Sequence, residues 1–276
     1  MIDCIDGDFF ESLADLTHGD IYSKQIAPSV DNINIIVNKL NKTPILFINT
    51  ERILELLNVV KDYKKEVIII SHNSDITLND AILNYIPSNV IRIWCQNYNG
   101  NPNDIIKALP IGLERNRWFP EEKKQDVLYE YSNKEINKEH LVYMNFNPNT
   151  NNIRKEWYEY FQNKDYVYSN MLGNGNNFKL YIEDVKKSKF VLSPTGNGID
   201  CHRNWECLCV GSIPIIEKSN FTNEIFKDLP VMLVDTFKDI TEENLNNFLN
   251  KKENNSITID KITKDYWRKL ILTDVR

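Results

Sequence analysis

The chain has 276 residues, of which 42% are hydrophobic and 26% charged, and its formal net charge is -6. This length predicts one large or two modest domains, and a content of nine Gly and ten Pro excludes a collagen-like or a Pro/Gly-rich disordered chain. The acidic net charge argues against a general nucleic-acid-binding surface, so we expect no nucleic-acid partner.

The first half of the chain alternates strand-like runs with helical patterns. Buried strands are predicted for PILFIN (44–49), EVIIIS (66–71) and VIRIW (90–94), because β-branched and apolar runs are typical of strands that are buried on both faces. Helices are predicted at 51–63 and 78–85. This β-α-β-α-β order predicts a parallel sheet with helices on both faces.

The second half repeats this order after a highly charged stretch, residues 120–138, which we interpret as a surface helix and a linker. The predicted fold class is therefore α/β, with one domain at residues 1–138 and a second at 139–276. The strands predicted in the second domain are 140–146, 165–168, 189–193, 212–216 and 229–233, and the helices are 153–161, 178–187, 201–210, 241–249 and 260–272.

The five cysteines show no ligand-pair spacing typical of a zinc site, so we interpret them as reduced and mostly buried thiols. The N-terminal run MIDCIDGDFF is acidic where a signal peptide is basic, and no apolar run approaches the ~20 residues of a membrane span. A cytoplasmic protein without an integral membrane segment is expected, with peripheral membrane association as the alternative. The cysteines are Cys4, Cys95, Cys201, Cys207 and Cys209.

The most informative segment is KFVLSPTGNGIDCHRNWECLCVGSIPII (189–216). A predicted strand leads into a loop with two glycines, and a helix begins after this loop. Glycines let the backbone approach a ligand, and the first N–H groups of the helix favour a phosphate. An anion-binding loop is therefore predicted, with a simple tight turn as the alternative. The loop residues are Ser193, Pro194, Thr195, Gly196, Asn197 and Gly198.

The helix after this loop carries a pair of opposite charges. Trp205, Leu208 and Cys209 share one helical face, which predicts that this face packs in the core. Arg203 and Glu206 lie next to each other on the other side. A guanidinium suits a diphosphate and a carboxylate suits two ribose hydroxyls, so the pair predicts a nucleotide clamp. A solvated ion pair is the alternative.

These residues resemble a known family. The run LSPTGNGIDCHRNWECLCVGSIPII (192–216) is similar to the signature of the exostosin-like glycosyltransferases, glycosyltransferase family 47. ISHNSD (70–75), LPIGLERNRWF (109–119) and YMNFNPNTNNIR (143–154) look similar to the same group, whereas residues 1–65 match less clearly. The resemblance implies a GT-B-like architecture, in which two Rossmann-like domains with parallel sheets face a central cleft and bind the acceptor and the donor, respectively.

The resemblance implies an enzyme that moves a hexosyl or pentosyl group from a nucleotide-sugar donor to a hydroxyl of a glycan or another acceptor. It assigns Gly196, Gly198, Arg203 and Glu206 to the donor site, together with the rest of the loop. Asp200 and His202 occupy the same loop-to-helix corner. His202 is a candidate contact to phosphate or sugar, with an ordinary capping or surface histidine as the alternative.

A second segment, NFNPNTNNIR (145–154), follows a predicted strand and opens a helix. The α1,3-fucosyltransferases, which also have the GT-B architecture, look similar here, with an arginine that faces the nucleotide. This similarity implies a donor-binding role for Arg154, which would lie in an early turn of the helix. A surface arginine is the alternative.

An inverting transferase needs a general base, usually a carboxylate or histidine, to take the proton of the acceptor hydroxyl. HNSD (72–75) follows the strongest strand of the first domain, so Asp75 and His72 are the catalytic candidates, with a capping turn as the alternative. Arg115 and Arg117 are candidate contacts to phosphate or to an acidic acceptor, with a solvated loop as the alternative.

No metal or cofactor is expected. Asp6 and Asp8 form the D-x-D pattern that binds Mn²⁺ in GT-A enzymes, but they do not follow a nucleotide-binding strand. We expect Arg203, Arg154 and helix N–H groups to stabilise the leaving diphosphate instead. Two alternatives are a metal-dependent GT-A transferase and a nucleotide- or glycan-binding protein that keeps the scaffold without turnover.

Overall fold

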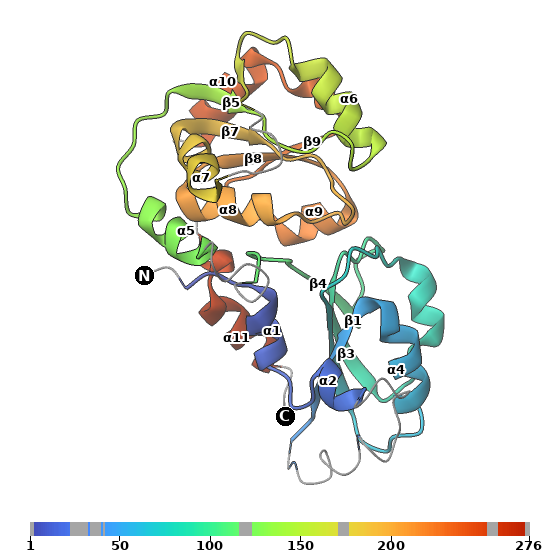
Figure 1. Cartoon of the computed structure of the whole chain (residues 1–276). Coiled ribbons are helices and arrows are strands. Elements are labelled where there is room, and N and C mark those ends of the chain that lie inside the picture. Colours follow the sequence, from blue (N-terminus) through green and yellow to red (C-terminus); the bar gives the residue numbers. More distant parts are fainter. Residues whose placement is uncertain are drawn as a thin grey trace. The chain divides into compact units, whose positions relative to one another are not determined.

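The computed structural model describes residues 3–22, 33, 40, 42–115, 123–170, 177–252 and 259–273. The chain divides into two compact units, each built around one parallel sheet (Figure 1). The β1–β4 unit comprises Ile5–Ile111 and Lys264–Arg276, and the β5–β9 unit comprises Met1–Cys4 and Gly112–Thr263. The predicted α/β class with two Rossmann-like parallel sheets is confirmed, whereas the predicted division between residues 138 and 139 stays a prediction.

The β1–β4 unit has its four strands in the order β1-β2-β3-β4, all parallel. The three predicted strands are present, and β4 was not predicted from the sequence. The strands are β1 Ile45–Asn49, β2 Val67–His72, β3 Val90–Gln96 and β4 Ile106–Leu109.

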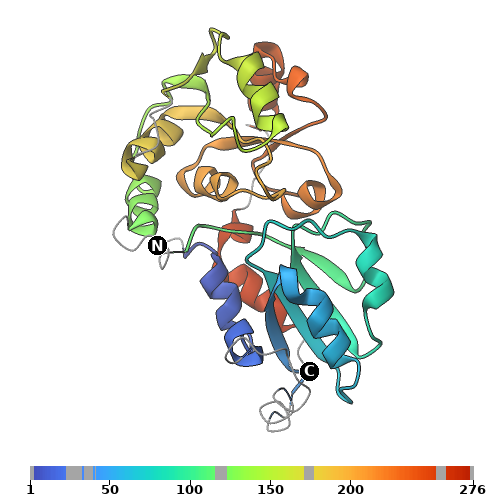
Figure 2. The ribbon, with the colours of Figure 1, turned by 45° about the vertical axis from the view of Figure 1, so that its right-hand side comes forward.

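Helices cover both faces of this sheet (Figures 1 and 2). The amphipathic pattern after β1 forms η2 (Thr50–Arg52) and α4 (Ile53–Val60), whose buried side chains pack on one face. The opposite face meets α1 (Gly7–Ser12) and α11 (Lys264–Leu272), where the ring of Trp267 contacts those of Phe10 and Trp94. The remaining elements are α2 (His18–Ile21) and η3 (Asp80–Tyr85).

The helix predicted at 78–85 is a 3₁₀ helix, η3, and begins only at Asp80. Its N-cap is Asn79, whose side chain accepts from the backbone N–H of Ala81 at 3.0 Å. The Asp80 carboxylate also accepts from the Tyr98 hydroxyl at 2.7 Å and from the backbone N–H of Asn101 at 2.9 Å. These contacts tie the start of η3 to the loop after β3.

The β5–β9 unit has five parallel strands in the order β6-β5-β7-β8-β9. Helices α6 and α10 cover one face, and α7 and α8 the other (Figures 1 and 2). The strands are β5 His140–Tyr143, β6 Val167–Tyr168, β7 Ser188–Leu192, β8 Ile213–Glu217 and β9 Met232–Val234. The helices are α5 Lys124–Ser132, α6 Asn152–Phe161, α7 Phe178–Lys187, α8 His202–Val210, α9 Asn220–Ile225 and α10 Glu242–Lys252, with 3₁₀ turns η5 Phe237–Asp239 and η6 Asp260–Ile262.

Helix α8 follows the predicted donor loop and is largely buried. Its predicted core face is confirmed, because Trp205, Leu208 and Cys209 are all buried. The helix ends at Gly211, whose φ of 79° lies in the left-handed region that favours glycine. The chain then turns directly into β8, so a short link fixes α8 against the sheet.

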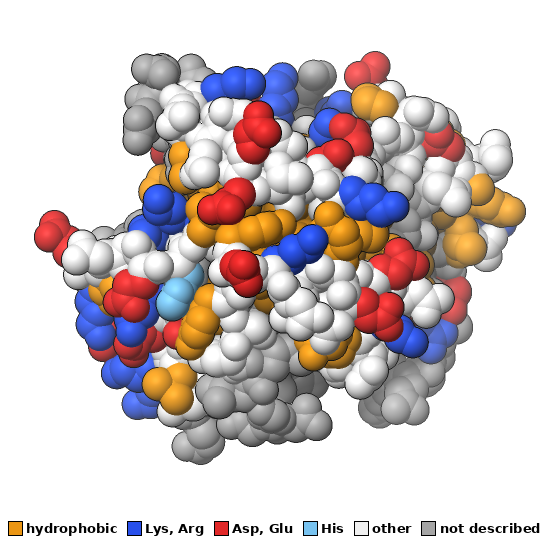
Figure 3. Space-filling model, turned by 90° about the horizontal axis from the view of Figure 1, so that it is seen from above, with side chains coloured by type: hydrophobic (Ala, Val, Ile, Leu, Met, Phe, Trp, Pro, Cys, Tyr) orange, Lys and Arg blue, Asp and Glu red, His pale blue; other side chains and the backbone are white. Residues whose placement is uncertain are grey.

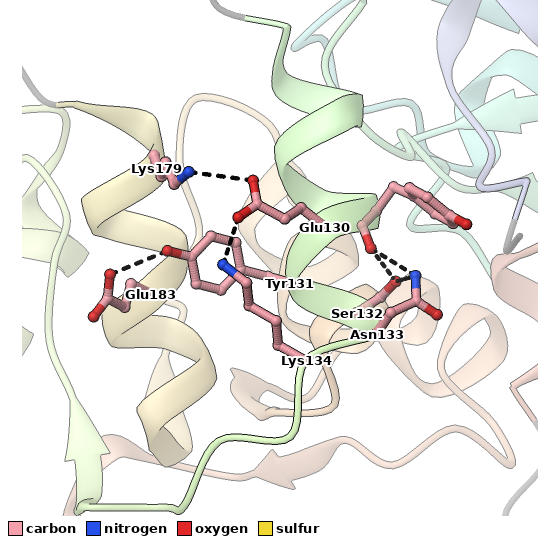
Figure 4. Close-up of polar contacts among 8 residues, drawn as sticks. Glu130, Tyr131, Ser132, Asn133, Lys134, Lys179 and Glu183 are labelled. Carbon is pink, nitrogen blue, oxygen red and sulfur yellow. Dashed lines mark hydrogen bonds and ion pairs between the residues drawn. The ribbon is translucent and has the colours of Figure 1, made fainter.

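Helix α5 confirms the surface helix predicted in the charged stretch. Figure 4 shows Glu130 and Tyr131 of α5 directed toward α7, whereas Ser132 and Asn133 do not point toward it. Lys179 Nζ lies 3.2 Å from the Glu130 carboxylate, and the Tyr131 hydroxyl donates to Glu183 at 3.0 Å. Two side chains of α5 are therefore joined to α7 by polar contacts.

The face drawn in Figure 3 carries Lys and Arg side chains interspersed with Asp and Glu, around groups of exposed hydrophobic side chains. In the described part of the chain, no helix is long and apolar enough to cross a membrane.

Candidate donor site

The two segments assigned to the donor site meet at the carboxyl ends of neighbouring strands, β5 and β7. The side-chain amide of Asn151 donates to the carbonyl oxygens of Thr195 at 3.0 Å and Gly196 at 2.6 Å. The same side chain caps α6 by accepting from the backbone N–H of Arg154 at 2.9 Å. One asparagine therefore joins the start of α6 to the glycine loop after β7.

Arg154 lies against this loop. Its Nε donates to the Thr195 carbonyl at 3.2 Å, and its Nη1 donates to the Thr150 hydroxyl at 3.2 Å. A Cβ at Gly196 would lie 2.8 Å from Arg154 Nη2, so the guanidinium occupies space that a larger residue would need. Burial, together with the positive charge of Arg203, lowers the pKa of Arg154.

Arg203 is the second residue of α8, and its guanidinium carbon lies 5.9 Å from the centre of the Phe146 ring. Its Nε is buried and has no hydrogen-bond partner within the described residues. Burial lowers the pKa of Arg203, but nearby ionisable groups, of which Tyr181 is the strongest, raise it overall. Within the same described part of the chain, no carboxylate lies within 4.0 Å of the Arg154 or Arg203 guanidinium.

The start of α8 adds backbone donors to these cations. The N-cap residue, Cys201, makes no side-chain capping hydrogen bond. Among the described residues, no acceptor is found for the first-turn N–H groups of His202 and Arg203. Such groups carry partial positive charge at a helix N-terminus and bind anions. Two guanidinium groups and this helix end therefore create a locally positive site within an acidic protein.

The clamp prediction placed Glu206 on the helix side opposite the core face. In the structure, however, Glu206 is buried. Its side chain is covered, the residue is 7% exposed, and its Oε2 accepts from the Tyr181 hydroxyl of α7 at 2.9 Å. Burial raises the pKa of Glu206, while His202 and the Tyr181 hydrogen bond act in the opposite direction. The solvated Arg203–Glu206 ion pair is therefore excluded by geometry, and the proposed contact of Glu206 to ribose stays a prediction.

Ser193 and Asp200 belong to a buried polar network. The Ser193 hydroxyl donates to Asn204 Oδ1 at 2.6 Å, and Asn204 Nδ2 donates to Asp200 Oδ1 at 2.9 Å. Asp200 also accepts from the backbone N–H of Cys201 at 2.9 Å and from Trp205 Nε1 at 2.9 Å. Both carboxylate oxygens of Asp200 thus hold the loop and α8 together, which favours a structural role over direct donor contact.

The remaining predicted residues of the corner differ in their surroundings. His202 Nδ1 donates to the Gly112 carbonyl at 2.8 Å. Asn197 is exposed, whereas Gly198 and Pro194 are buried. The Pro194 carbonyl accepts from the Cys201 thiol at 3.8 Å. Asn197 is therefore the loop side chain that is most accessible to a ligand.

The catalytic candidates lie in the β1–β4 unit, with very different exposure. His72 is 1% exposed, and its Nε2 and Nδ1 lie 3.0 Å from the Pro110 carbonyl and 2.8 Å from Asn73 Oδ1, respectively. Its ring also packs 5.3 Å from that of Phe10. Asp75, in contrast, is exposed on the loop after β2. This geometry favours a structural role for His72 and leaves Asp75 as the accessible group.

The other charged candidates are the D-x-D pattern, Arg115 and Arg117. Asp6 is the N-cap of α1 and accepts from the backbone N–H of Phe9 at 2.7 Å, so one oxygen of the D-x-D pattern is engaged. Arg115 is buried, and Arg117 lies outside the described residues. In the described ranges, no group of three or more His, Cys, Asp or Glu is arranged to hold a metal ion.

Comparison with known families bears on the β5–β9 unit. Residues 162–238 match the family model described as RXYLT1 C-terminal domain, which is glycosyltransferase-related. The match includes β7, the glycine loop, α8 and β8, and it ends before α10. It does not specifically support the exostosin-like family. No curated protein matches the chain.

Asp200→Ala tests the buried network. The substitution removes the acceptor of two buried side-chain N–H groups and a backbone N–H, so we expect the free energy of unfolding to fall by roughly 2–4 kcal/mol. Urea denaturation followed by tryptophan fluorescence measures the change. Asn197→Ala, in the exposed part of the same loop, is the control and should change stability little; equal stability of both variants would contradict the network.

Glu206→Gln tests the energetic effect of the buried carboxylate. Because burial raises the folded-state pKa above the unfolded value, the folded state retains this proton to higher pH and loses stability as the pH rises. The neutral amide avoids this loss and can still accept from Tyr181. We expect the free energy of unfolding of the variant to match that of the wild type near pH 4 and to exceed it toward pH 8. The lower pH lies close to ~4.3, the pKa of an unperturbed Glu.

Urea unfolding at several pH values measures this difference. Glu156→Gln, on the exposed surface of α6, removes the same charge without burial and is the matched control. A Glu206→Gln variant that loses stability relative to the wild type as the pH rises would contradict the assignment.

Proposed function

We propose that this protein is a glycosyltransferase that moves a sugar from a nucleotide-sugar donor to a hydroxyl of a glycan or another acceptor. The observation that carries the proposal is the pair formed by Arg154 and Arg203 beside the glycine loop, without a carboxylate within 4.0 Å among the described residues. Partly buried cations without a counter-ion are costly unless a ligand neutralises them. A diphosphate supplies the missing negative charge.

The chemistry of the site fits the departure of a nucleoside diphosphate. Breaking the bond between the sugar and the diphosphate leaves negative charge on the phosphate oxygens. Arg154 and Arg203 would bind these oxygens, and the N–H groups of His202 and Arg203 at the start of α8 would donate to them. Because these groups are held by the fold before the reaction, they stabilise the leaving group with little reorganisation. This is why we propose that donor binding is independent of a metal ion.

The acceptor hydroxyl must lose a proton as it attacks the sugar, so the proposed reaction includes a general base. Asp75 is the candidate that the geometry favours, because it is exposed and no hydrogen bond or ion pair to it is found in the described part of the chain. Asp75 would take the proton of the hydroxyl, and the new glycosidic bond would form as the diphosphate leaves.

Donor binding is the first test. Arg154→Gln and Arg203→Gln remove a positive charge but keep most of each side chain, and we expect each to weaken nucleoside-diphosphate binding about ten- to a hundredfold, since a charge-assisted hydrogen bond contributes about 1.5–3 kcal/mol. Calorimetric titration with UDP, GDP, CDP and dTDP measures this, followed by the corresponding nucleotide sugars. Donors that carry xylose belong in this set, because the matched family is ribitol xylosyltransferase-like.

Lys155→Ala is the matched control, because Lys155 is the neighbour of Arg154 on α6 but is exposed and pairs with Glu159 at 3.9 Å. It should leave the affinity unchanged. The wild-type titration is repeated with EDTA and with Mn²⁺. Equal affinities are expected, and binding only with Mn²⁺ would overturn the metal-independent site. Unchanged affinity in both arginine variants would reject the donor site itself.

Turnover is the second test, and it separates an enzyme from a binding protein. Asp75→Asn keeps the size of the side chain but removes the base, so we expect transfer to fall about 10²–10⁴-fold while donor affinity stays nearly constant. His72→Gln, at a buried position, should mainly lower thermal stability. Full transfer by Asp75→Asn would place the base elsewhere, and a wild-type protein that binds donors but never transfers sugar would favour the binding alternative.

A further inference from the structure

Two cysteines that are distant in sequence meet in the β5–β9 unit. Cys4 Sγ lies 2.7 Å from Cys209 Sγ, although 205 positions separate them in the chain. A disulfide bond brings two sulfur atoms to about 2.05 Å, so this thiol pair is close to bonding distance. Both thiols are free in this structure.

The backbone holds each thiol in place. Cys4 forms an isolated antiparallel bridge with Thr263, which fixes the segment before α1. Cys209 lies in the last turn of α8, whose end is fixed by the Gly211 cap. The sulfur atoms are therefore brought together by the fold and do not depend on a chance side-chain orientation.

A pocket of about 180 Å³ gives access to the pair. Both sulfur-bearing residues line it, and α5 forms one wall with Leu128, Tyr129 and Ser132. Neighbouring side chains of α5, among them Glu130 and Tyr131, are directed toward α7, as Figure 4 shows. Cys4 is partly exposed, whereas Cys209 is 5% exposed. A small molecule in this pocket would thus reach Cys4 first.

The other cysteines have different neighbours. Cys95 is fully buried in β3, where its thiol donates to the Gln96 carbonyl at 3.3 Å. Cys207 is also fully buried, and Cys201 lies against Arg154 and the Pro194 carbonyl. Within the described residues, Cys4 and Cys209 are the pair whose sulfur atoms are in contact.

We propose that Cys4 and Cys209 form a redox-active pair, which a low-molecular-weight disulfide such as oxidised glutathione converts into an intramolecular disulfide. The Cys4 thiolate attacks one sulfur of the small disulfide, which gives a mixed disulfide and releases one thiol. Cys209 then loses its proton and attacks the Cys4 sulfur, which releases the second thiol. The protein loses two electrons and two protons, and the small disulfide gains them.

The order of the two attacks follows from the surroundings of the sulfur atoms. The hydrogen bond with Cys4, and then burial, raise the pKa of the Cys209 thiol well above its usual range. Cys209 therefore stays protonated until the Cys4 sulfur has been activated as the target of its attack. Because Cys4 is also the more exposed residue, it is the first nucleophile.

The test uses the full chain, fully reduced and then exposed to oxidised glutathione without denaturant. The thiol count should fall from five to three, and mass spectrometry should find a mass loss of two hydrogen atoms and one peptide pair that links Cys4 to Cys209. Because the cross-link closes a long loop, the oxidised protein should also melt several degrees higher than the reduced one.

Single variants separate the two roles. Cys209→Ser should stop at a glutathione adduct on Cys4, whereas Cys4→Ser should form neither an adduct on Cys209 nor an intramolecular disulfide. Cys207→Ser is the matched control on α8 and should fall from four thiols to two. If Cys209→Ser does not fold, Cys4→Ser still provides the test. Five unreacted wild-type thiols, a lasting adduct on wild-type Cys4, or a link between other cysteines would overturn the proposal.

Discussion

The close approach of Arg154 to Gly196 is the constraint on which the candidate site depends. The guanidinium can lie against the loop after β7 because position 196 has no Cβ, which would lie 2.8 Å from Nη2. Asn151 then fixes both partners, since it caps α6 and holds the carbonyls of Thr195 and Gly196. Substituting Gly196 or Asn151 would change the position of the Arg154 guanidinium relative to the loop, and with it the electrostatic potential at the site.

At the start of α8, the atoms that hold the fold together differ from those proposed to bind the donor. Asp200 uses both carboxylate oxygens to hold Cys201, Asn204 and Trp205, so it stabilises the start of α8. The backbone N–H groups of His202 and Arg203 at that start have no acceptor among the described residues, and helix-start N–H groups of this kind bind anions. The same segment can therefore be rigid and still offer donors, because different atoms serve the two purposes.

Much of the fold could be predicted from the sequence, because β-branched runs and helical periodicity are local signals. The strands beginning at Ile45, Val67 and Val90 lie within or close to their predicted ranges. The short strand at Ile106–Leu109 was missed, since four residues carry little periodicity. The buried position of Glu206 could not be predicted either, because it depends on Tyr181 from α7, 25 residues earlier in the chain.

The candidate site shows the same limit. The glycine loop could be predicted from sequence because it follows a strand, and ligands bind at the carboxyl ends of parallel strands. The role of Arg154 was implied by the similarity to the α1,3-fucosyltransferases and stays a prediction. NPNTNN (147–152) was predicted to cap the helix, and Asn151 is its N-cap, but the bonds of Asn151 to the glycine loop and the role of Asn204 were not predicted. Nothing local identifies Asn204 or the contact between Cys4 and Cys209, because these depend on how distant segments pack.

The last helix of the chain belongs to the same unit as the first sheet, so a cut between the two halves of the sequence does not separate the two units. Helix α11 belongs to the β1–β4 unit, where Trp267 is buried against Phe10 and Trp94. Cys4, near the other end of the chain, belongs instead to the β5–β9 unit. A cut at residue 138 would therefore separate Trp267 from its aromatic partners and Cys4 from Cys209. Each half would then lose a contact made by the opposite end of the chain, so binding, turnover and thiol chemistry all have to be measured on the intact protein.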